Sequence, residues 1–210
     1  MIELQTLLLF MGASALLAIT PGPDILYVIT LGITRGAKAA VATTMGLTSG
    51  VLVHTTAAAL GVSVIFKTSE LAFTIVKFAG ALYLFYLAYQ AFKHRNDLVR
   101  LDKVNESPKS YKNLYIKGFF MNVLNPKVSL FFLAFLPQFV NPALGSVPVQ
   151  MIQLGIVFMF TTIVIFSTCG ILANKASAAL MERPNIAKIV NTLAASLFLA
   201  LGLRLAISER

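Results

Sequence analysis

The sequence predicts an all-α polytopic membrane protein, with six transmembrane helices arranged as two inverted three-helix repeats. Three observations predict it: the composition is apolar, six apolar segments are long enough to cross a bilayer, and proline interrupts two of them at matching places. Of the 210 residues, 58% are hydrophobic and 12% are charged, against roughly 45–50% and about 25% in soluble domains. Such a chain has too few polar residues to cover a surface that faces water.

The spanning elements are predicted to be helices, because about 20 apolar residues of helix cross a hydrocarbon core of about 30 Å. The alternating pattern of a membrane barrel is not present. In chain order the predicted spans are Leu4–Ile33, Ala37–Phe66, Leu71–Phe92, Ile116–Val140, Pro148–Ala173 and Ile186–Ile207. A polar stretch divides them, so the predicted domains are a first repeat (1–92), a basic cytoplasmic linker (93–115) and a second repeat (116–210).

The positive net charge of +9 is explained by topology. The loops after spans one, three and five hold two, seven and three Lys or Arg residues, whereas the opposite side has only Lys67, Arg204 and Arg210. This bias places the three odd-numbered loops in the cytoplasm and both termini outside. We therefore expect the basic loops to contact anionic membrane lipid, and we expect no nucleic acid partner.

The first span is too long to cross the membrane as one straight helix. Leu4–Ile33 has 30 residues, or roughly 45 Å of α-helix, against a core of about 30 Å. The segment Thr20–Asp24 interrupts it, because its two prolines remove backbone donors and its glycine disfavours a helix. A cap followed by a proline is also how helices begin. We therefore predict that a second helix starts inside the membrane.

The fourth span repeats this pattern, with Asn125 as the cap and Pro126 as the first helical residue. Each break leaves a half-helix whose N-terminal end, with free N–H groups and a positive dipole, attracts an anion such as a carboxylate. Freed backbone groups are tolerated in a membrane only where protein or a water-filled cavity satisfies them. A plain proline kink is the alternative for either break. Two breaks in corresponding helices, each beside an ionisable residue, favour one composite binding site.

The candidate substrate-binding residues lie at and next to the two breaks. They are Pro21, Gly22, Pro23, Asp24, Asn122, Asn125, Pro126 and Lys127. Asp24 and Lys127 occupy like positions in the two halves, and intramembrane charges usually face a partner or a cavity, so we expect them to pair. The alternatives are a carboxylate that caps its own half-helix and a lysine that reaches the cytoplasmic edge.

His54 lies in the middle of the second span, beside a stripe of threonines. The proton-coupling candidates are therefore Asp24, His54 and Lys127; for His54 the alternative is a ring satisfied by a neighbouring carbonyl. Lys77 lies near the outer end of the third span, where a functional role and a side chain reaching the interface both stay open. No nucleophile–base pair or metal-ligand cluster stands out among the spans, so the sequence predicts no enzyme, no metal and no cofactor.

Gly46 and Gly50 form a GxxxG motif in the second span. Two small residues four apart let another helix approach closely. The motif fits packing inside the chain as well as a seam between two copies.

With these residues in view, the chain resembles the lysine-exporter (LysE) superfamily, and most closely its homoserine/threonine-exporter (RhtB) branch. The first-helix signature is similar to Thr20–Pro23 followed by Gly32, Arg35-Gly36 and Gly46. The third and fourth helices resemble the family's at Lys77–Leu84 and at Phe119–Val140. The resemblance covers the whole length.

The resemblance implies a secondary transporter in the bacterial inner membrane that exports amino acids such as threonine, homoserine or leucine, driven by the proton gradient or the membrane potential. It also implies two inverted repeats and a homodimer. The working hypothesis is proton antiport, with the substrate carboxylate at the half-helix ends and its ammonium at Asp24. The rivals are export of another small metabolite or a cation on the same scaffold, and a membrane subunit that scaffolds a partner through its basic loop.

Overall fold

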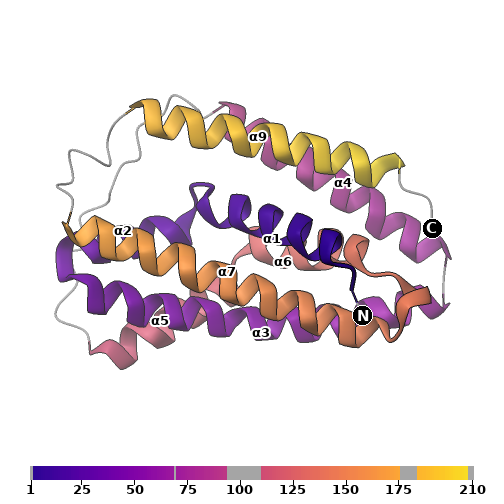
Figure 1. The fold of residues 1–210 in the computed structure, drawn as a ribbon, viewed down its shortest axis with the longest axis horizontal. Coiled ribbons are helices and arrows are strands. Elements are labelled where there is room, and N and C mark those ends of the chain that lie inside the picture. The colour runs from indigo at the N-terminus through magenta and orange to yellow at the C-terminus, as the bar shows by residue number, and fades with distance from the viewer. Residues whose placement is uncertain (1, 69, 94–109, 176–183, 208–210) are drawn as a thin grey trace.

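The computed structural model describes residues 2–68, 70–93, 110–175 and 184–207, and every regular element in these ranges is helical. The helices run roughly parallel in one elongated bundle (Figure 1). The predicted all-α class is confirmed for the described residues. Positions 94–109, the centre of the predicted linker, lie outside them.

The first predicted span is broken where the sequence predicts. Helix α1 (Leu4–Ile19) and helix α2 (Pro23–Arg35) meet at an angle of 62°. Pro23 is the first residue of α2, and Gly22 before it has extended backbone dihedrals. A proline suits this first position, where its missing N–H costs nothing.

The fourth predicted span is also broken at its proline. Helix α5 (Tyr111–Val123) is followed, at a bend of 49°, by helix α6 (Pro126–Leu130), the π-helical turn η1 (Phe131–Phe135) and the 3-10 turn η2 (Leu136–Phe139). Two features differ from the prediction. Helix α5 begins at Tyr111, inside the predicted linker, because the Ser110 hydroxyl caps it by accepting from the Asn113 N–H at 3.3 Å. The second half-helix changes its winding before Pro137, which has no N–H to continue an α-helix.

Four long helices contain the remaining predicted spans. They are α3 (Ala37–Thr68), α4 (Glu70–Lys93), α7 (Val147–Lys175) and α9 (Pro184–Ile207), and the 3-10 turn η3 (Pro142–Leu144) precedes α7. By length and composition, α7 crosses a membrane on its own, and each bent pair makes a further span, up to three among the described residues.

The helices pack across the two halves of the sequence. Helix α3 lies on α5 and α7, α1 and α2 lie on α7, and α4 pairs with α9 along one side of the bundle, uppermost in Figure 1. The largest core cluster is rich in phenylalanine, with Phe10, Phe131, Phe132, Phe135, Phe139 and Phe158 all buried. Both halves of the sequence therefore contribute to one core.

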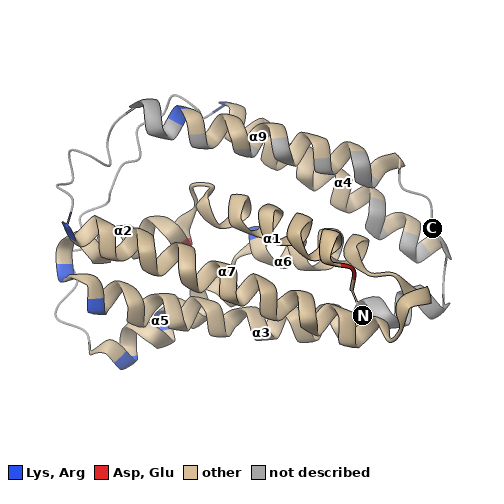
Figure 2. Cartoon of the chain, in the orientation of Figure 1, with Lys and Arg blue, Asp and Glu red and all other residues tan. Residues whose placement is uncertain are grey.

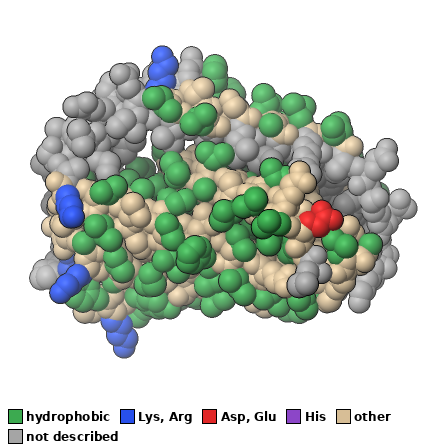
Figure 3. Space-filling view, viewed as in Figure 1, with side chains coloured by type: hydrophobic (Ala, Val, Ile, Leu, Met, Phe, Trp, Pro, Cys, Tyr) green, Lys and Arg blue, Asp and Glu red, His purple; other side chains and the backbone are tan. Residues whose placement is uncertain are grey.

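The exterior is apolar along the bundle and basic at one end. Leu52, Leu82, Ile156 and Phe160 are among many large apolar side chains exposed on its flanks, and one such face is shown in Figure 3. Most of the Lys and Arg residues coloured in Figure 2 lie at the end where α2, α4 and α7 finish, on the left. Helix α1 begins and α9 ends at the opposite end (Figure 1). An apolar flank with charged ends is the surface expected of a membrane-spanning bundle.

The GxxxG motif packs inside the chain. A Cβ atom on Gly46 would collide with the backbone oxygen of Tyr115, and one on Gly50 would lie 2.9 Å from the side-chain oxygen of Asn122. Both contacts belong to α5, so the two glycines let α3 and α5 approach closely. The homodimer therefore gains no support from this motif.

Candidate functional site

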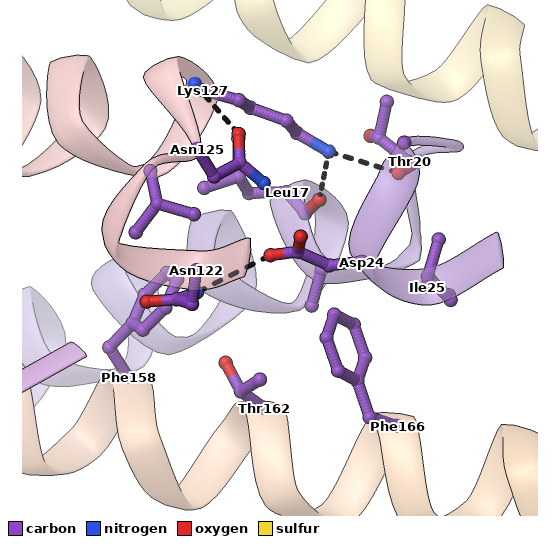
Figure 4. A pocket seen from close by; sticks show the side chains of 13 residues that line it. Leu17, Thr20, Asp24, Ile25, Asn122, Asn125, Lys127, Phe158, Thr162 and Phe166 are labelled. Atoms are coloured by element: carbon purple, nitrogen blue, oxygen red, sulfur yellow. Dashed lines mark hydrogen bonds between the residues drawn. The ribbon is translucent and has the colours of Figure 1, made fainter. Parts of the chain in front are cut away.

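One cavity lies where the two broken spans meet (Figure 4). The first span contributes Leu17, Thr20, Gly22 and Asp24 to its wall, among others. Asn122, Asn125 and Lys127 come from the second broken span, and Phe158, Thr162 and Phe166 come from α7. About 370 Å³ around these residues is free of atoms when the space open to the exterior is counted, and the enclosed part is much smaller.

The structure brings most of the predicted site residues to this cavity. Gly22, Asp24, Asn122, Asn125 and Lys127 line it. The prolines Pro21, Pro23 and Pro126 are not among its lining residues; they shape the backbone around it. Whether these residues bind a substrate stays a prediction.

Lys127 is bound to the end of α1. Its ammonium nitrogen donates to the carbonyl oxygen of Leu17 at 2.7 Å and to that of Thr20 at 2.9 Å. In an unbroken helix the Leu17 carbonyl would accept from the N–H four residues later, but that residue is Pro21. Lys127 thus replaces the missing donor, and its positive charge suits the negative end of the α1 dipole. Among the described residues it makes these bonds instead of the predicted direct pair with Asp24, and it does not extend to the cytoplasmic edge.

Asp24 is buried, at 5% exposure, in the first turn of α2. One carboxylate oxygen, Oδ2, accepts from the amide nitrogen of Asn122 at 3.3 Å. The other oxygen, Oδ1, is buried without a hydrogen-bond partner in the part of the chain that the structure describes. Asp24 therefore bonds across to the second broken span rather than to its own half-helix. It keeps one acceptor that lacks a donor.

His54 binds a backbone carbonyl at the second break, as Lys127 does at the first, but this carbonyl also has a backbone donor. Its Nε2 lies 3.0 Å from the carbonyl oxygen of Asn122 and must donate to it, since a carbonyl only accepts. Pro126, four positions on, offers that carbonyl no N–H, but the Asn125 N–H donates to it at 2.9 Å, so His54 adds a second donor. The alternative of a histidine satisfied by a neighbouring carbonyl is what the structure shows. His54 touches the site through Asn122 but does not line the cavity.

The two half-helix ends are not equivalent, although the sequence treats them alike. The start of α6 is capped, because the Asn125 side-chain oxygen accepts from the Lys127 N–H at 2.9 Å. The start of α2 has Gly22 at its cap position and no side-chain cap. Gly22 and Asp24 both line the cavity, so the uncapped N–H groups of α2 are the ones placed to meet an anion.

Sequence reasoning missed the wall that α7 contributes. Phe158, Thr162 and Phe166 follow one another at four-residue spacing, which puts them on one face of the helix. The signal was the pair Thr161-Thr162 within an otherwise apolar span. The structure does not describe the side chain of Lys77 on α4, so both interpretations of this residue stay predictions.

We expect Lys127→Met to destabilise the fold by about 1–3 kcal/mol, the usual cost of leaving a buried carbonyl without its donor. Methionine keeps the length and apolar stem of lysine but cannot donate to the Leu17 carbonyl. The measurement is the thermal unfolding midpoint of the purified protein in detergent. Lys112→Met, at an exposed position near the start of α5, is the matched control. Equal midpoints for the two variants would contradict the role of Lys127 as a cap.

Comparison with known proteins shows the family of the chain. The model of the family described as LysE type translocator matches residues 15–209. A homoserine/homoserine lactone efflux protein of Salmonella typhimurium is 31% identical, with 94% of each chain covered. A threonine efflux protein of Salmonella typhi is 29% identical over 90% of this chain and 92% of its own. The membrane protein YrhP of Bacillus subtilis is 30% identical over 78% of this chain and 80% of its own. No solved structure matches the chain.

Proposed function

The chain belongs to the family of LysE type translocators, a family of transporters rather than enzymes, and we propose that it exports amino acids across the bacterial inner membrane. The observation that carries the proposal is the buried Asp24 carboxylate beside the uncapped start of α2, in a cavity between two broken spans. A free amino acid carries an ammonium and a carboxylate on neighbouring atoms. The cavity offers a partner for each.

The ammonium of the substrate is assigned to Asp24. The Oδ1 atom of Asp24 is buried and makes no hydrogen bond of good geometry among the described residues, although the Asn125 amide and the Lys127 charge are near enough to stabilise the carboxylate. A substrate ammonium supplies both a donor and the opposite charge, so it is the ligand that this oxygen favours. Asn122 holds the other carboxylate oxygen and thereby fixes the direction of the first.

The carboxylate of the substrate is assigned to the start of α2 and to Lys127. The N–H groups at an uncapped helix start bind anions. The Lys127 ammonium lies beside Gly22, since a Cβ atom built there would be 3.6 Å from it. A lysine has three N–H donors, and two of them go to the Leu17 and Thr20 carbonyls. The third can reach a bound carboxylate.

The substrate class that we propose is that of threonine, homoserine and leucine. Two of the relatives are named as efflux proteins for homoserine or threonine, which supports short side chains. Coupling is assigned to proton antiport, with Asp24, His54 and Lys127 as candidate carriers of the proton. One proton moving inward contributes roughly 2.3 kcal/mol per 100 mV of membrane potential, enough to drive accumulation outside.

The transport cycle is assigned to two inverted repeats that rock about the cavity, with both termini outside and two chains in a homodimer. The helix contacts support such a pseudo-twofold: α3 packs on its counterpart α7, and α4 packs on its counterpart α9. The matching breaks support it as well, because at each break a titratable side chain binds the carbonyl that lies four residues before the proline. Broken helices at the interface of two repeats are typical of transporter binding sites.

The proposal predicts proton-driven efflux from proteoliposomes that contain the purified protein. Vesicles loaded with radiolabelled threonine, homoserine or leucine should release it faster when a proton gradient is directed against the efflux, and an uncoupler should abolish the acceleration. The control is vesicles with the protein inactivated at Asp24. Release of a metabolite or cation but of no amino acid would replace the proposal by its rival. A scaffold subunit would release nothing and would lose its role on deletion of residues 100–108.

A further inference from the structure

The polar groups around the cavity have mostly found partners. Asn125 caps α6, the amide nitrogen of Asn122 bonds to Asp24, and the Thr20 hydroxyl donates to the Leu16 carbonyl at 2.6 Å. The oxygen of Asn122 turns toward Gly50 of α3. Among the described residues that line the cavity, Asp24 Oδ1, Asn122 Oδ1 and the Thr162 hydroxyl are buried and without a partner, and Thr162 is the one of the three that carries a hydroxyl.

Thr162 differs from its neighbour on the same helix. A threonine inside a helix usually donates its hydroxyl to the carbonyl four residues earlier. Thr161 does so, to Val157 at 2.8 Å. Thr162 is 3% exposed, makes no such bond and lines the cavity. Other buried hydroxyls without partners, on Thr43, Thr44 and Thr48, are not among the cavity residues, so the combination of the two properties distinguishes Thr162.

The surroundings of this hydroxyl are aromatic. Phe158 and Phe166 lie one turn before and one turn after Thr162 and are 3% and 5% exposed. In Figure 4 the Thr162 side chain projects from α7 toward Asp24, between the two phenylalanines. This wall is apolar with one hydroxyl at its centre, opposite the groups assigned to the ammonium and the carboxylate. In the substrate orientation proposed above, the side chain of the amino acid faces this wall.

We propose that Thr162 is a specificity-determining residue, which selects amino acids with a hydroxyl on a short aliphatic side chain over those with a methyl group in its place. The proposal rests on the amino-acid export proposed above and adds the choice among substrates. A threonine hydroxyl both donates and accepts, so it can pair with a substrate hydroxyl in either direction. A substrate methyl group would leave the buried Thr162 hydroxyl unpaired, whereas Phe158 and Phe166 contact the aliphatic part of either substrate.

The test uses two pairs of substrates that differ only by hydroxyl against methyl: threonine with valine, and homoserine with norvaline. Initial rates of release from proteoliposomes are measured for wild type, Thr162→Val, Thr162→Ser and Thr161→Val. We expect Thr162→Val to lower both hydroxyl-to-methyl rate ratios roughly three- to tenfold, the equivalent of one net hydrogen bond. Thr162→Ser retains the hydroxyl and should keep ratios close to wild type. Thr161→Val removes a hydroxyl that is already satisfied and should not change them.

Each outcome separates this inference from the proposed function. Ratios unchanged in Thr162→Val, with wild type still releasing amino acids, would overturn the role of Thr162 alone. An equal fall in all four rates would also overturn it, because it would show a general loss rather than a change of selectivity. If wild type releases none of the four amino acids, the proposed function fails first.

Discussion

Replacing Asp24 with asparagine is expected to lower amino-acid export about tenfold to a hundredfold. Asparagine has nearly the same shape, and its side-chain oxygen can still accept from Asn122, so the bond at 3.3 Å between the two spans can persist. What is lost is the negative charge beside the substrate ammonium. A hydrogen bond to a charged group contributes about 1.5–3 kcal/mol, and every 1.4 kcal/mol is a factor of ten in binding or rate. The measurement is the initial rate of threonine release from proteoliposomes with matched protein content.

The design needs a carboxylate control and a fold control. Glu3 is an exposed acid before the first turn of α1, so Glu3→Gln removes one negative charge without touching the cavity. Its release rate should equal that of wild type. The elution profile of Asp24→Asn in detergent should also match wild type, which separates a loss of transport from a loss of folding. Export at the wild-type rate by correctly folded Asp24→Asn would show that Asp24 does not hold the ammonium.

The positions of the two breaks could be predicted from sequence because they depend on local chemistry. Proline has no backbone N–H and fixes its own φ angle, and these properties hold in any fold. The same is true of the Asn125 cap, whose side chain reaches only two residues along the chain. The extents of the long helices followed from the length of apolar segment that a bilayer requires. Each of these features is decided within a few turns of helix.

The side chains that bind the backbone carbonyls at the two breaks could not be predicted, because tertiary packing decides which side chains come near. Leu17 and Lys127 are 110 positions apart, so no local sequence motif contains both of them. The sequence suggested that opposite charges would pair, whereas the lysine bonds to the carbonyls that Pro21 leaves without a donor. His54 likewise bonds to a backbone carbonyl distant in sequence, that of Asn122, which also accepts from the Asn125 N–H. In a membrane the need to satisfy backbone groups decided against the direct ion pair.

The α7 wall shows a second limit of the sequence. Nothing in an apolar span states which of its faces lines a cavity and which packs on neighbours, since both are apolar. Thr161 and Thr162 are adjacent, yet one bonds within its helix and the other lines the site. That difference depends on how α7 is rotated against α2 and α3. Close glycine contacts fix this rotation, among them Gly170 against Ala40, at 2.5 Å from an added Cβ.

Adding one methyl group at Gly46 is expected to destabilise the protein by about 1–2 kcal/mol. The new Cβ in Gly46→Ala would collide with the backbone oxygen of Tyr115 and lie 2.8 Å from its carbonyl carbon. A backbone cannot rotate away as a side chain can, so α3 and α5 must separate. Overpacking of this kind costs typically about 1–3 kcal/mol and occasionally more. The gain in helix propensity, about 1 kcal/mol, offsets only part of it.

Gly61 supplies the matched control, because it lies on the same helix and an added Cβ would meet nothing within 4 Å. Gly61→Ala should therefore keep or raise the thermal unfolding midpoint in detergent, whereas Gly46→Ala should lower it. The effect should reach the site, since α5 carries Asn122, which orients Asp24 and accepts from His54. Export per folded molecule should thus fall in Gly46→Ala and stay constant in Gly61→Ala. Equal midpoints for the two variants would mean that the α3–α5 contact is looser than the structure shows, and that Asn122 is held in place by other contacts.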